Sequence, residues 1–354
     1  MKKQYPDTLI IGGLFVLWRA ILLGIERIAP VFWPLRDNFL GQLSPWANFD
    51  GVHYTRIARW GYAQYEQAFF PLYPLLIRYT AYITKLPYEY AAIGISHMAS
   101  FIGLFLFWRY LEGSRGRPWT IAFLLLYPAG FFFAAAYSES VFFAFAAGAL
   151  LAIKKRQWFL SSILVALASA TRLVGVFLIV PLVFVARKRW WAVAIAPTGL
   201  FAYIAYLWKT VGDPLAFFHV QPAFGAGRSG DAFIFLPQVF WRYGRIFTTV
   251  PTGDLLYHVA ILELGTFILG AALLVVAWRK RYDASILLYS ACVLVLPTLT
   301  GTLSSMPRYL LAAFPLFGVL GEMKSTGWKI MLLIVFFAIL IYATTGFLQG
   351  YFIS

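Results

Sequence analysis

Long apolar runs separated by short basic clusters form the main pattern of this chain. A helix needs about 20 residues to cross the roughly 30 Å hydrocarbon core of a bilayer, and shorter runs sit between neighbouring helices. Eleven apolar runs are present, so we predict an all-α polytopic membrane protein with about eleven transmembrane helices. The predicted spans cover residues 8–29, 89–111, 119–136, 139–153, 158–171, 173–186, 190–208, 256–278, 284–301, 309–321 and 328–348.

The basic clusters fall between alternate spans, and their positions predict the orientation of the chain. Loops rich in Lys and Arg stay on the cytoplasmic side of a membrane. We therefore expect a multi-pass cell membrane protein with a cytoplasmic N-terminus and an external C-terminus. The first apolar run is long and lacks a small-residue cleavage site, which favours an uncleaved span over a signal peptide. The clusters are Lys2-Lys3, Arg115/Arg117, Lys154-Lys155-Arg156, Arg187-Lys188-Arg189, Arg279-Lys280-Arg281 and Lys324/Lys329.

This orientation places most of the carboxylates on the external side. We expect one integral membrane domain over residues 1–354, with a first external loop at about 30–88 and a long external segment at about 209–255. Within the latter, LPQVFWRYGRIF is typical of an interfacial helix, because Trp and Tyr favour the headgroup region. The active site is therefore expected at the external face. The external carboxylates are Asp37, Asp50, Glu66, Glu89, Glu139, Asp213, Asp231 and Asp254.

Composition agrees with a membrane protein and narrows its chemistry. Hydrophobic residues make up 61% of the chain and charged residues 12%, with a mean hydropathy of +0.75, whereas soluble domains carry about 25% charged residues. The net charge of +15 is explained by the cytoplasmic clusters, so no nucleic-acid partner is expected. Cys292 is the single cysteine, which excludes an internal disulfide framework. The sequence contains no Walker loop, dinucleotide fingerprint or metal-ligand spacing, so neither a nucleotide cofactor nor a protein-bound metal is predicted.

Polar residues concentrate in the first external loop, in the segment WANFDGVHYTRIARWGY. At helical spacing, Asp50, His53 and Tyr54 fall on one face. Arg56 and Arg59 fall on the other. In one interpretation, the first face offers a carboxylate with two substrate-binding side chains, and the second faces a phosphate or lipid headgroups. In the alternative, the segment is an interfacial amphipathic helix that Asp50 merely caps.

Two further carboxylates lie next to unusual apolar segments. Glu66, a further candidate for substrate binding, precedes the proline-broken stretch AFFPLYP, and such breaks near a membrane are tolerated where they line a cavity. Tyr137 and Glu139 belong to the turn AYSES, which suits binding to sugar hydroxyls or orienting an arginine. The alternative for this turn is helix capping, with Ser138 as the capping side chain and Glu139 in the first turn.

Arg172 and Arg308 are lone arginines flanked by long apolar runs, in SATRLVG and SMPRYLL. Charged residues at such a depth are costly, so they face a cavity or a partner. Arg binds phosphate through two parallel hydrogen bonds and does not deprotonate. Both residues are therefore candidates for binding a lipid phosphate. The alternatives are snorkelling to the headgroups or pairing with Glu139 or Asp50.

Four segments together resemble the PIG-V (GPI mannosyltransferase 2) family and its prokaryotic relatives, which belong to the GT-C glycosyltransferase superfamily. They are FDGVHYTRIARWGYAQYEQAFFPLYPLLIR, YPAGFFFAAAYSESVFF, SATRLVGVFL and MPRYLLAAFPLF, in the same order as in that family, within residues 46–317. The family usually has Trp-Asp where this chain has Phe49-Asp50, which keeps the carboxylate and replaces one aromatic ring with another.

The resemblance implies a GT-C-like helix bundle with interfacial helices in the first external loop. It also implies inverting transfer of a hexose, most simply mannose, from a polyprenyl-phosphate donor at the external face. Asp50 matches the general base, and Arg308, Arg172, Arg56 and Arg59 would stabilise the leaving phosphate. No cofactor is certain, although some GT-C enzymes use a divalent cation. The expected partners are membrane lipids, the lipid-linked donor, and a glycolipid, glycan or protein acceptor.

A membrane transporter or a flippase for lipids or lipid-linked sugars is the alternative function. Intramembrane arginines and proline-broken helices also fit that class. Transporters, however, tend to show an internal repeat and polar residues at the membrane midplane, and here the polar residues gather at one face. A non-catalytic scaffold would leave the external cluster of polar residues unexplained.

Overall fold

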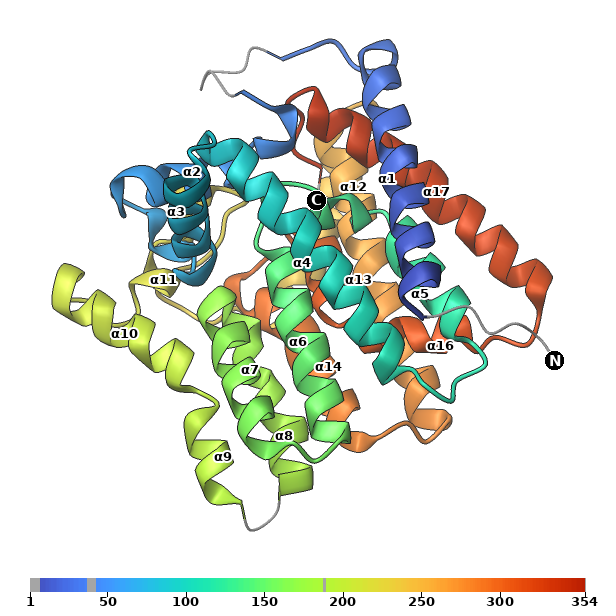
Figure 1. Ribbon diagram of the computed structural model, residues 1–354. Helices are drawn as coiled ribbons and strands as arrows, with labels where there is room; N and C mark the ends of the chain where they lie inside the picture. Colours follow the sequence, from blue (N-terminus) through green and yellow to red (C-terminus); the bar gives the residue numbers. More distant parts are fainter. Residues whose placement is uncertain (1–6, 37–42, 187–188, 354) are drawn as a thin grey trace.

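The computed structural model of the protein describes residues 7–36, 43–186 and 189–353, and the regular elements in these ranges are all helices (Figure 1). The prediction of an all-α fold is therefore confirmed. Three sets of residues named above lie outside the described ranges, namely Lys2-Lys3, Asp37 and Arg187-Lys188.

Five helical stretches in the described part of the chain are long and apolar enough to cross a bilayer. They coincide with five predicted spans. They are α1 (Asp7–Phe32), α4 (Tyr88–Tyr110), α9 and α10 together (Trp190–Val211), α13 (Leu255–Arg279) and α17 (Thr326–Leu348). The shorter apolar helices are α5 (Arg117–Leu126), α6 (Glu139–Lys154), α7 (Trp158–Thr171), η4 with α8 (Leu173–Ala186) and α14 with η6 (Ala284–Thr300). The count of eleven spans stays a prediction.

Two predicted spans are not continuous helices. The run 119–136 contains α5, which ends at Leu126, and the short 3-10 helix η3 (Gly130–Phe133). The run 309–321 is divided among α15 (Met306–Ala312), η7 (Phe314–Leu316) and α16 (Phe317–Gly321). Pro128 and Pro315 lie at these breaks, and proline has no backbone N–H to continue a helix. The broken segments are buried by other helices, as irregular backbone at membrane depth must be.

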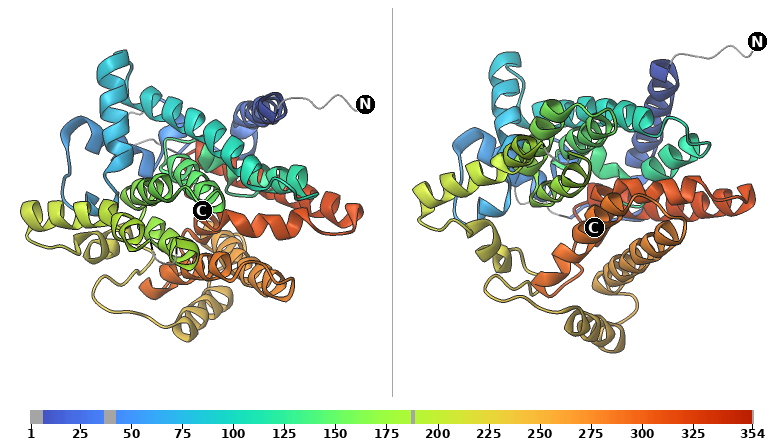
Figure 2. Two further views of the ribbon diagram at one scale, coloured as in Figure 1. Left: turned by 60° about the horizontal axis from the view of Figure 1, so that its bottom comes forward. Right: turned by 90° about the horizontal axis from the view of Figure 1, so that it is seen from below.

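The remaining helices belong to the two segments predicted to be external. α2 (Asp50–Trp60) and α3 (Leu72–Thr84) form the first loop, in which helices were predicted. α11 (Ala216–His219) and α12 (Leu236–Thr249) form the second, and α12 matches the predicted helix LPQVFWRYGRIF. Figure 2 shows α12, drawn in tan, at the periphery of the molecule on the side away from α1.

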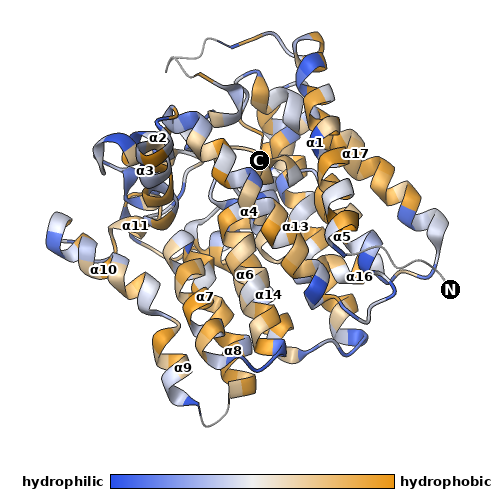
Figure 3. Cartoon of the chain, viewed as in Figure 1, coloured by the Kyte–Doolittle hydropathy of each residue, from blue (hydrophilic) through white to orange (hydrophobic). Residues whose placement is uncertain are grey.

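The centre of the bundle is α6, whose residues are nearly all buried between α4 and α7. On another side, α1 and α17 pack against each other. Apolar side chains cover the outward faces of these two helices, including Leu17 and Ile334, which are 60% and 62% exposed (Figure 3). Such faces suit contact with lipid.

Hydrogen bonds and ion pairs connect segments next to several of the basic clusters at one end of the bundle. Asp7, at the start of α1, accepts from Arg109 at 3.2 Å and lies 3.5 Å from Arg117. Lys154 donates to the carbonyl of Tyr110 at 2.7 Å. Glu322 accepts from Ser114 and Tyr282 at 3.2 and 2.7 Å. Several of the loops that were predicted to be cytoplasmic therefore share one end of the described structure.

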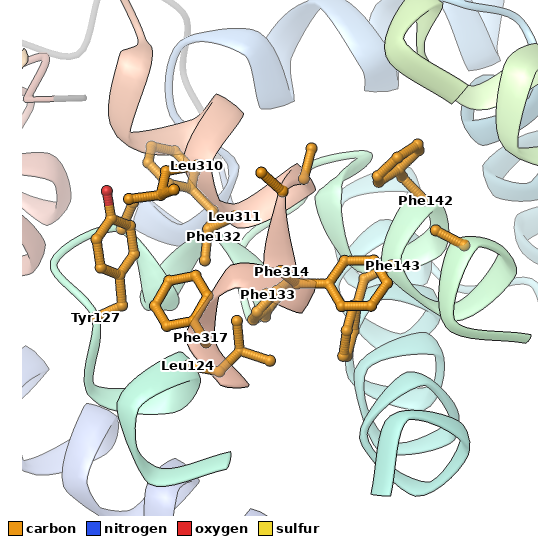
Figure 4. Close-up of a cluster of buried hydrophobic side chains, with 14 of the residues drawn as sticks. Leu124, Tyr127, Phe132, Phe133, Phe142, Phe143, Leu310, Leu311, Phe314 and Phe317 are labelled. Atoms are coloured by element: carbon orange, nitrogen blue, oxygen red, sulfur yellow. The ribbon is translucent and has the colours of Figure 1, made fainter. Parts of the chain in front are cut away.

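An aromatic core joins the two broken segments to α6 (Figure 4). The ring of Phe143 on α6 packs 5.0 Å from Phe133 of η3 and 5.0 Å from Phe314 of η7, measured between centroids. These rings are almost completely buried. Because α6 and α15 both begin beside this core, their first turns lie close together, and both turns carry charged residues.

Gly103 allows α4 to pack closely on α6, and its replacement tests this packing. A Cβ at Gly103 would lie 2.5 Å from Cδ1 of Phe143, a ring that the aromatic core holds in place. Overpacking of this kind costs about 1–3 kcal/mol. We expect Gly103→Ala to lower the midpoint of thermal unfolding in detergent micelles.

Gly94 on the same helix is the matched control, because a Cβ there would meet nothing within 4 Å. Gly94→Ala should keep or slightly raise the midpoint, since alanine favours helix over glycine. Equal losses in both variants would contradict close packing of α4 on α6 at Gly103.

Candidate active site

A cavity of about 1000 Å³ opens at the end of the bundle away from the basic clusters described above. Its walls come from the start of α2, the turn between α7 and η4, the second external segment with the start of α13, and the stretch before and into α15. The lining mixes aromatic and aliphatic side chains with a small number of charged ones. A ligand site of this kind binds an amphipathic molecule and fixes its orientation through the few polar groups.

The backbone around Asp50 is held in an unusual conformation. Phe49 has φ +55°, which costs energy for a residue with a side chain. Its ring packs against Phe347 and Phe352, with centroids at 5.6 and 5.1 Å. The Tyr137 hydroxyl accepts from the Asp50 amide at 3.2 Å and donates to a neighbouring backbone carbonyl. Asp50 is thus the first residue of α2, and its side chain lines the cavity.

Two arginines and two carboxylates form a buried charged cluster beside the cavity, here called the charge quartet (Asp50, Glu139, Arg172 and Arg308). Arg308 donates from Nη1 to Asp50 Oδ2 at 2.7 Å and from Nε to Glu139 Oε1 at 2.5 Å. Arg172 pairs with the same oxygen of Glu139. The Arg308 guanidinium also lies over the ring of Tyr137, 4.8 Å from its centroid.

Burial explains why these four charges occur together. The side chains of Glu139, Arg308 and Arg172 are 3%, 8% and 12% exposed, and a buried charge is tolerated only when it is paired. Asp50 is the more accessible of the two carboxylates, at 22%. Glu139 and Tyr137, predicted to bind substrate, do not line the cavity. Instead, from buried positions, Glu139 binds Arg308, and Tyr137 binds the backbone at the start of α2.

For both lone arginines, the sequence allowed pairing with Glu139 or Asp50 as an alternative to phosphate binding. The structure shows that pairing. The capping alternative for the turn AYSES is half right, because Ser138 is the N-cap residue and Glu139 lies in the first turn of α6, but the Ser138 hydroxyl makes no capping bond. It instead bonds the Tyr54 hydroxyl at 2.8 Å. Burial, together with the nearby Glu139 carboxylate, raises the pKa of the Tyr54 phenol, which therefore stays protonated at the cavity wall.

The buried carboxylate of Glu66 accepts hydrogen bonds from partly exposed side chains of α2. It accepts from Nδ1 of His53 at 3.1 Å, from Nε of Arg56 at 2.7 Å and from the Ala63 amide at 2.9 Å. Burial raises the pKa of Glu66, but these hydrogen bonds outweigh it and hold the pKa below its usual value. His53 stacks on Phe69 and lines the cavity, whereas Glu66 does not.

The predicted separation of Arg56 from His53 on α2 is wrong. Residues three apart on a helix are neighbours, so His53 and Arg56 reach the same oxygen of Glu66. Arg59 lies over the rings of Trp60 and Tyr88, at 5.1 and 5.0 Å. Neither arginine lines the cavity, so their predicted contact with a phosphate there is not supported by their positions.

Sequence reasoning missed a carboxylate on the wall formed by α13. Glu263, midway along α13, is 6% exposed and lines the cavity. Its Oε1 accepts from the Ser305 amide at 3.1 Å, and its Oε2 accepts from the Tyr243 hydroxyl. Tyr243 also accepts from the Leu303 amide at 3.1 Å. These bonds hold the loop that leads into α15. The signal was present, since Glu263 is a lone charge in an apolar run, as Arg172 is.

No group of three or more His, Cys, Asp or Glu side chains in the described ranges is placed to hold a metal ion. A divalent cation therefore stays a prediction from the resemblance.

Comparisons with known proteins give a family. The model of glycosyltransferase family 87 matches residues 70–305, well over half of the chain. No curated protein matches. Among solved structures, the chain is similar to the Archaeoglobus fulgidus oligosaccharyltransferase in complex with Zn and sulfate, with 12% identity and a TM-score of 0.42. That alignment covers 94% of this chain and 53% of the other, so the chain spans about half the length of that protein.

Removal of the Glu139 charge tests the charge quartet. In Glu139→Gln, two buried guanidiniums share one remaining carboxylate, and the loss of one partner from a buried pair costs about 3–5 kcal/mol. We expect a large fall in the midpoint of thermal unfolding. Glu112→Gln is the matched control, because the Glu112 side chain is 62% exposed and pairs with Arg109 at 3.8 Å. Exposed pairs contribute about 0–1 kcal/mol, so similar shifts in both variants would contradict the structural role of Glu139.

Proposed function

The chain belongs to glycosyltransferase family 87, and from that premise we propose that it transfers a hexose, mannose in the first instance, from a polyprenyl-phosphate carrier to an acceptor hydroxyl at the external face of the membrane. The prediction of a membrane glycosyltransferase is confirmed at the level of the family and of the apolar helices. The closer likeness to the PIG-V family stays a prediction. The donor, the sugar and the side of the membrane belong to the proposal.

The mechanism rests on the position of Asp50, which lines the cavity and accepts a hydrogen bond from Arg308. A hydroxyl has a pKa far above 7, so it needs a base as its oxygen bonds to the sugar. Asp50 Oδ2 accepts from Arg308, which leaves Oδ1 to take the proton of the acceptor hydroxyl. Arg308 thereby orients the base.

The bond changes follow from this arrangement. The acceptor oxygen attacks the anomeric carbon, and its proton passes to Asp50. The bond between the anomeric carbon and the phosphate oxygen breaks, and the lipid phosphate leaves with the electron pair. Attack and departure on opposite faces of the sugar invert the anomeric centre. The leaving phosphate is an anion at once, so it needs cationic stabilisation and no proton donor.

A lipid-linked donor fits the cavity better than a nucleotide sugar does. The sequence carries no nucleotide-binding motif, and apolar side chains from α12 and α13 line one wall. A volume of about 1000 Å³ is at the upper end of common ligand sites, enough for a sugar, a phosphate and the first part of a polyprenyl chain. The acceptor class, whether glycolipid, glycan or protein, is left to experiment.

Asp50→Asn tests the assigned base. The variant keeps the shape of the side chain and loses its basicity, and a positioned base contributes about 10²–10⁴-fold to the rate. We expect turnover with polyprenyl-phosphate mannose to fall at least about 100-fold, with the thermal midpoint showing that the protein remains folded. Products are identified by mass spectrometry of the acceptor, with polyprenyl-phosphate glucose as the second donor.

Asp283→Asn is the matched control, because it makes the same substitution at a residue that does not line the cavity. Asp283 caps α14 by accepting from the Ser285 amide at 2.8 Å, and asparagine caps a helix equally well. This variant should keep wild-type turnover. Wild-type turnover in Asp50→Asn would overturn the assignment of the base, and no product from either donor with the wild-type protein would overturn the proposed donor.

A further inference from the structure

The arginines predicted to bind a phosphate are already engaged. Arg308 and Arg172 are neutralised by the two carboxylates of the charge quartet. Arg56 is paired with Glu66, and Arg59 lies outside the cavity against aromatic rings. The positive charge of the first three is already balanced by a carboxylate, so each offers an entering anion little net attraction. Further cationic groups line the cavity on the wall formed by α12 and the segment before it.

Arg228 and Arg242 lie on that wall, and each is half-buried. Arg228 belongs to the connection that precedes α12, and Arg242 lies on α12 itself. Over the described parts of the chain, neither has a carboxylate within salt-bridge distance. Their neighbour Glu263 interacts with both electrostatically, but its oxygens accept from Tyr243 and from the Ser305 amide.

The hydrogen bonds of the two arginines leave most of their donors unused. Arg228 donates from Nη2 to the Ser304 hydroxyl at 3.0 Å. Arg242 donates from Nη1 to the carbonyls of Gly227 and Gly301, at 3.1 and 3.4 Å. A guanidinium has five N–H donors in a rigid fork, so these contacts fix each group and leave further donors for a ligand.

Gly227 brings the two arginines together. It precedes Arg228 in the chain, and a Cβ on it would lie 2.7 Å from Nη2 of Arg242. The absence of a side chain therefore lets the Arg242 guanidinium rest against the backbone that carries Arg228. Two guanidiniums that line one cavity and keep unused donors match the several oxygens of a phosphate.

The apolar surroundings narrow the ligand further. Ile246, Leu255, Leu256 and Val259 line the same cavity beside Arg242, on α12 and the first turns of α13. A free phosphate would gain nothing from these side chains, whereas a phosphate on a long hydrocarbon chain would bury the first part of that chain against them.

We propose that Arg228 and Arg242 form the phosphate subsite of the cavity and bind the phosphate of a lipid-linked sugar. Arg172 and Arg308 then act as positioning residues for Asp50. This inference rests on the proposed function for the identity of the lipid, and it assigns the anion to arginines that make no ion pair with the base. The phosphate of the donor would then bind Arg228 and Arg242, while Arg172 and Arg308 position the base.

Direct binding of polyprenyl monophosphate without a sugar tests the subsite independently of transfer. The double variant Arg228→Gln/Arg242→Gln should bind this probe at least 10-fold more weakly than the wild-type protein in detergent micelles, and should bind uncharged polyprenol unchanged. Arg245→Gln is the control, because Arg245 is exposed on the same helix and does not line the cavity. It should keep wild-type binding of both probes.

A glycine pair tests the same subsite with every arginine retained. Gly227→Ala would displace the Arg242 guanidinium, whereas a Cβ at Gly225 would meet nothing within 4 Å. Both glycines have positive φ, +55° and +68°, and Gly225 also has ψ −149°, a region that only glycine readily occupies, so Gly225→Ala carries a backbone strain of its own without displacing Arg242. Gly227→Ala should weaken binding of the probe and Gly225→Ala should not. This comparison also decides the matter if the double arginine variant fails to fold.

The outcomes separate the subsite from the proposed function. Weakened binding in the double variant and in Gly227→Ala supports the subsite even if the wild-type protein transfers no sugar. Unchanged binding in both overturns the subsite even if transfer is observed. Competition experiments show which kind of phosphate compound the subsite recognises. Displacement of the probe by inorganic phosphate supports recognition of the phosphate group itself, whereas equal displacement by phosphatidylglycerol micelles overturns the assignment to a lipid-linked sugar.

Discussion

The arrangement of the cavity depends on one buried guanidinium. Arg308 bonds Asp50 and Glu139 at once, and these residues lie on α15, α2 and α6. Arg308 and Glu139 are too deeply buried to be tolerated without a charged partner, whereas Asp50 is 22% exposed. The helices that carry them must therefore meet at this point, and the aromatic core of Phe133, Phe143 and Phe314 provides the surface on which two of them meet.

Apolar periodicity and the basic clusters predicted most of the helices and the grouping of several charged loops at one end. The predicted spans across Pro128 and Pro315 are interrupted rather than continuous helices, because a run of apolar residues does not distinguish a continuous helix from a buried, broken one. Asp50, His53, Arg172 and Arg308 were predicted from their residue types and surroundings, and the structure places them at one cavity.

The partners of these side chains were harder to predict. Pairing of Arg308 with Asp50 joins residues 258 positions apart, and nothing in local spacing specifies such a contact. Glu263 carried the same signal as Arg172 and was overlooked, whereas Arg228 and Arg242 lie in a polar segment where an arginine is unremarkable by sequence alone. Arg228 and Arg242 became candidates only because the structure shows which other arginines are paired with carboxylates.

The neutrality of the charge quartet has a consequence for how the protein responds to its surroundings. Mobile ions screen exposed charges over a distance of about 8 Å at physiological ionic strength, but they reach buried pairs much less. The ion pairs of the charge quartet are therefore only weakly screened by salt. The half-buried guanidiniums of Arg228 and Arg242 are screened more strongly, so ionic strength would alter binding of an anion at the proposed subsite more than pairing within the quartet.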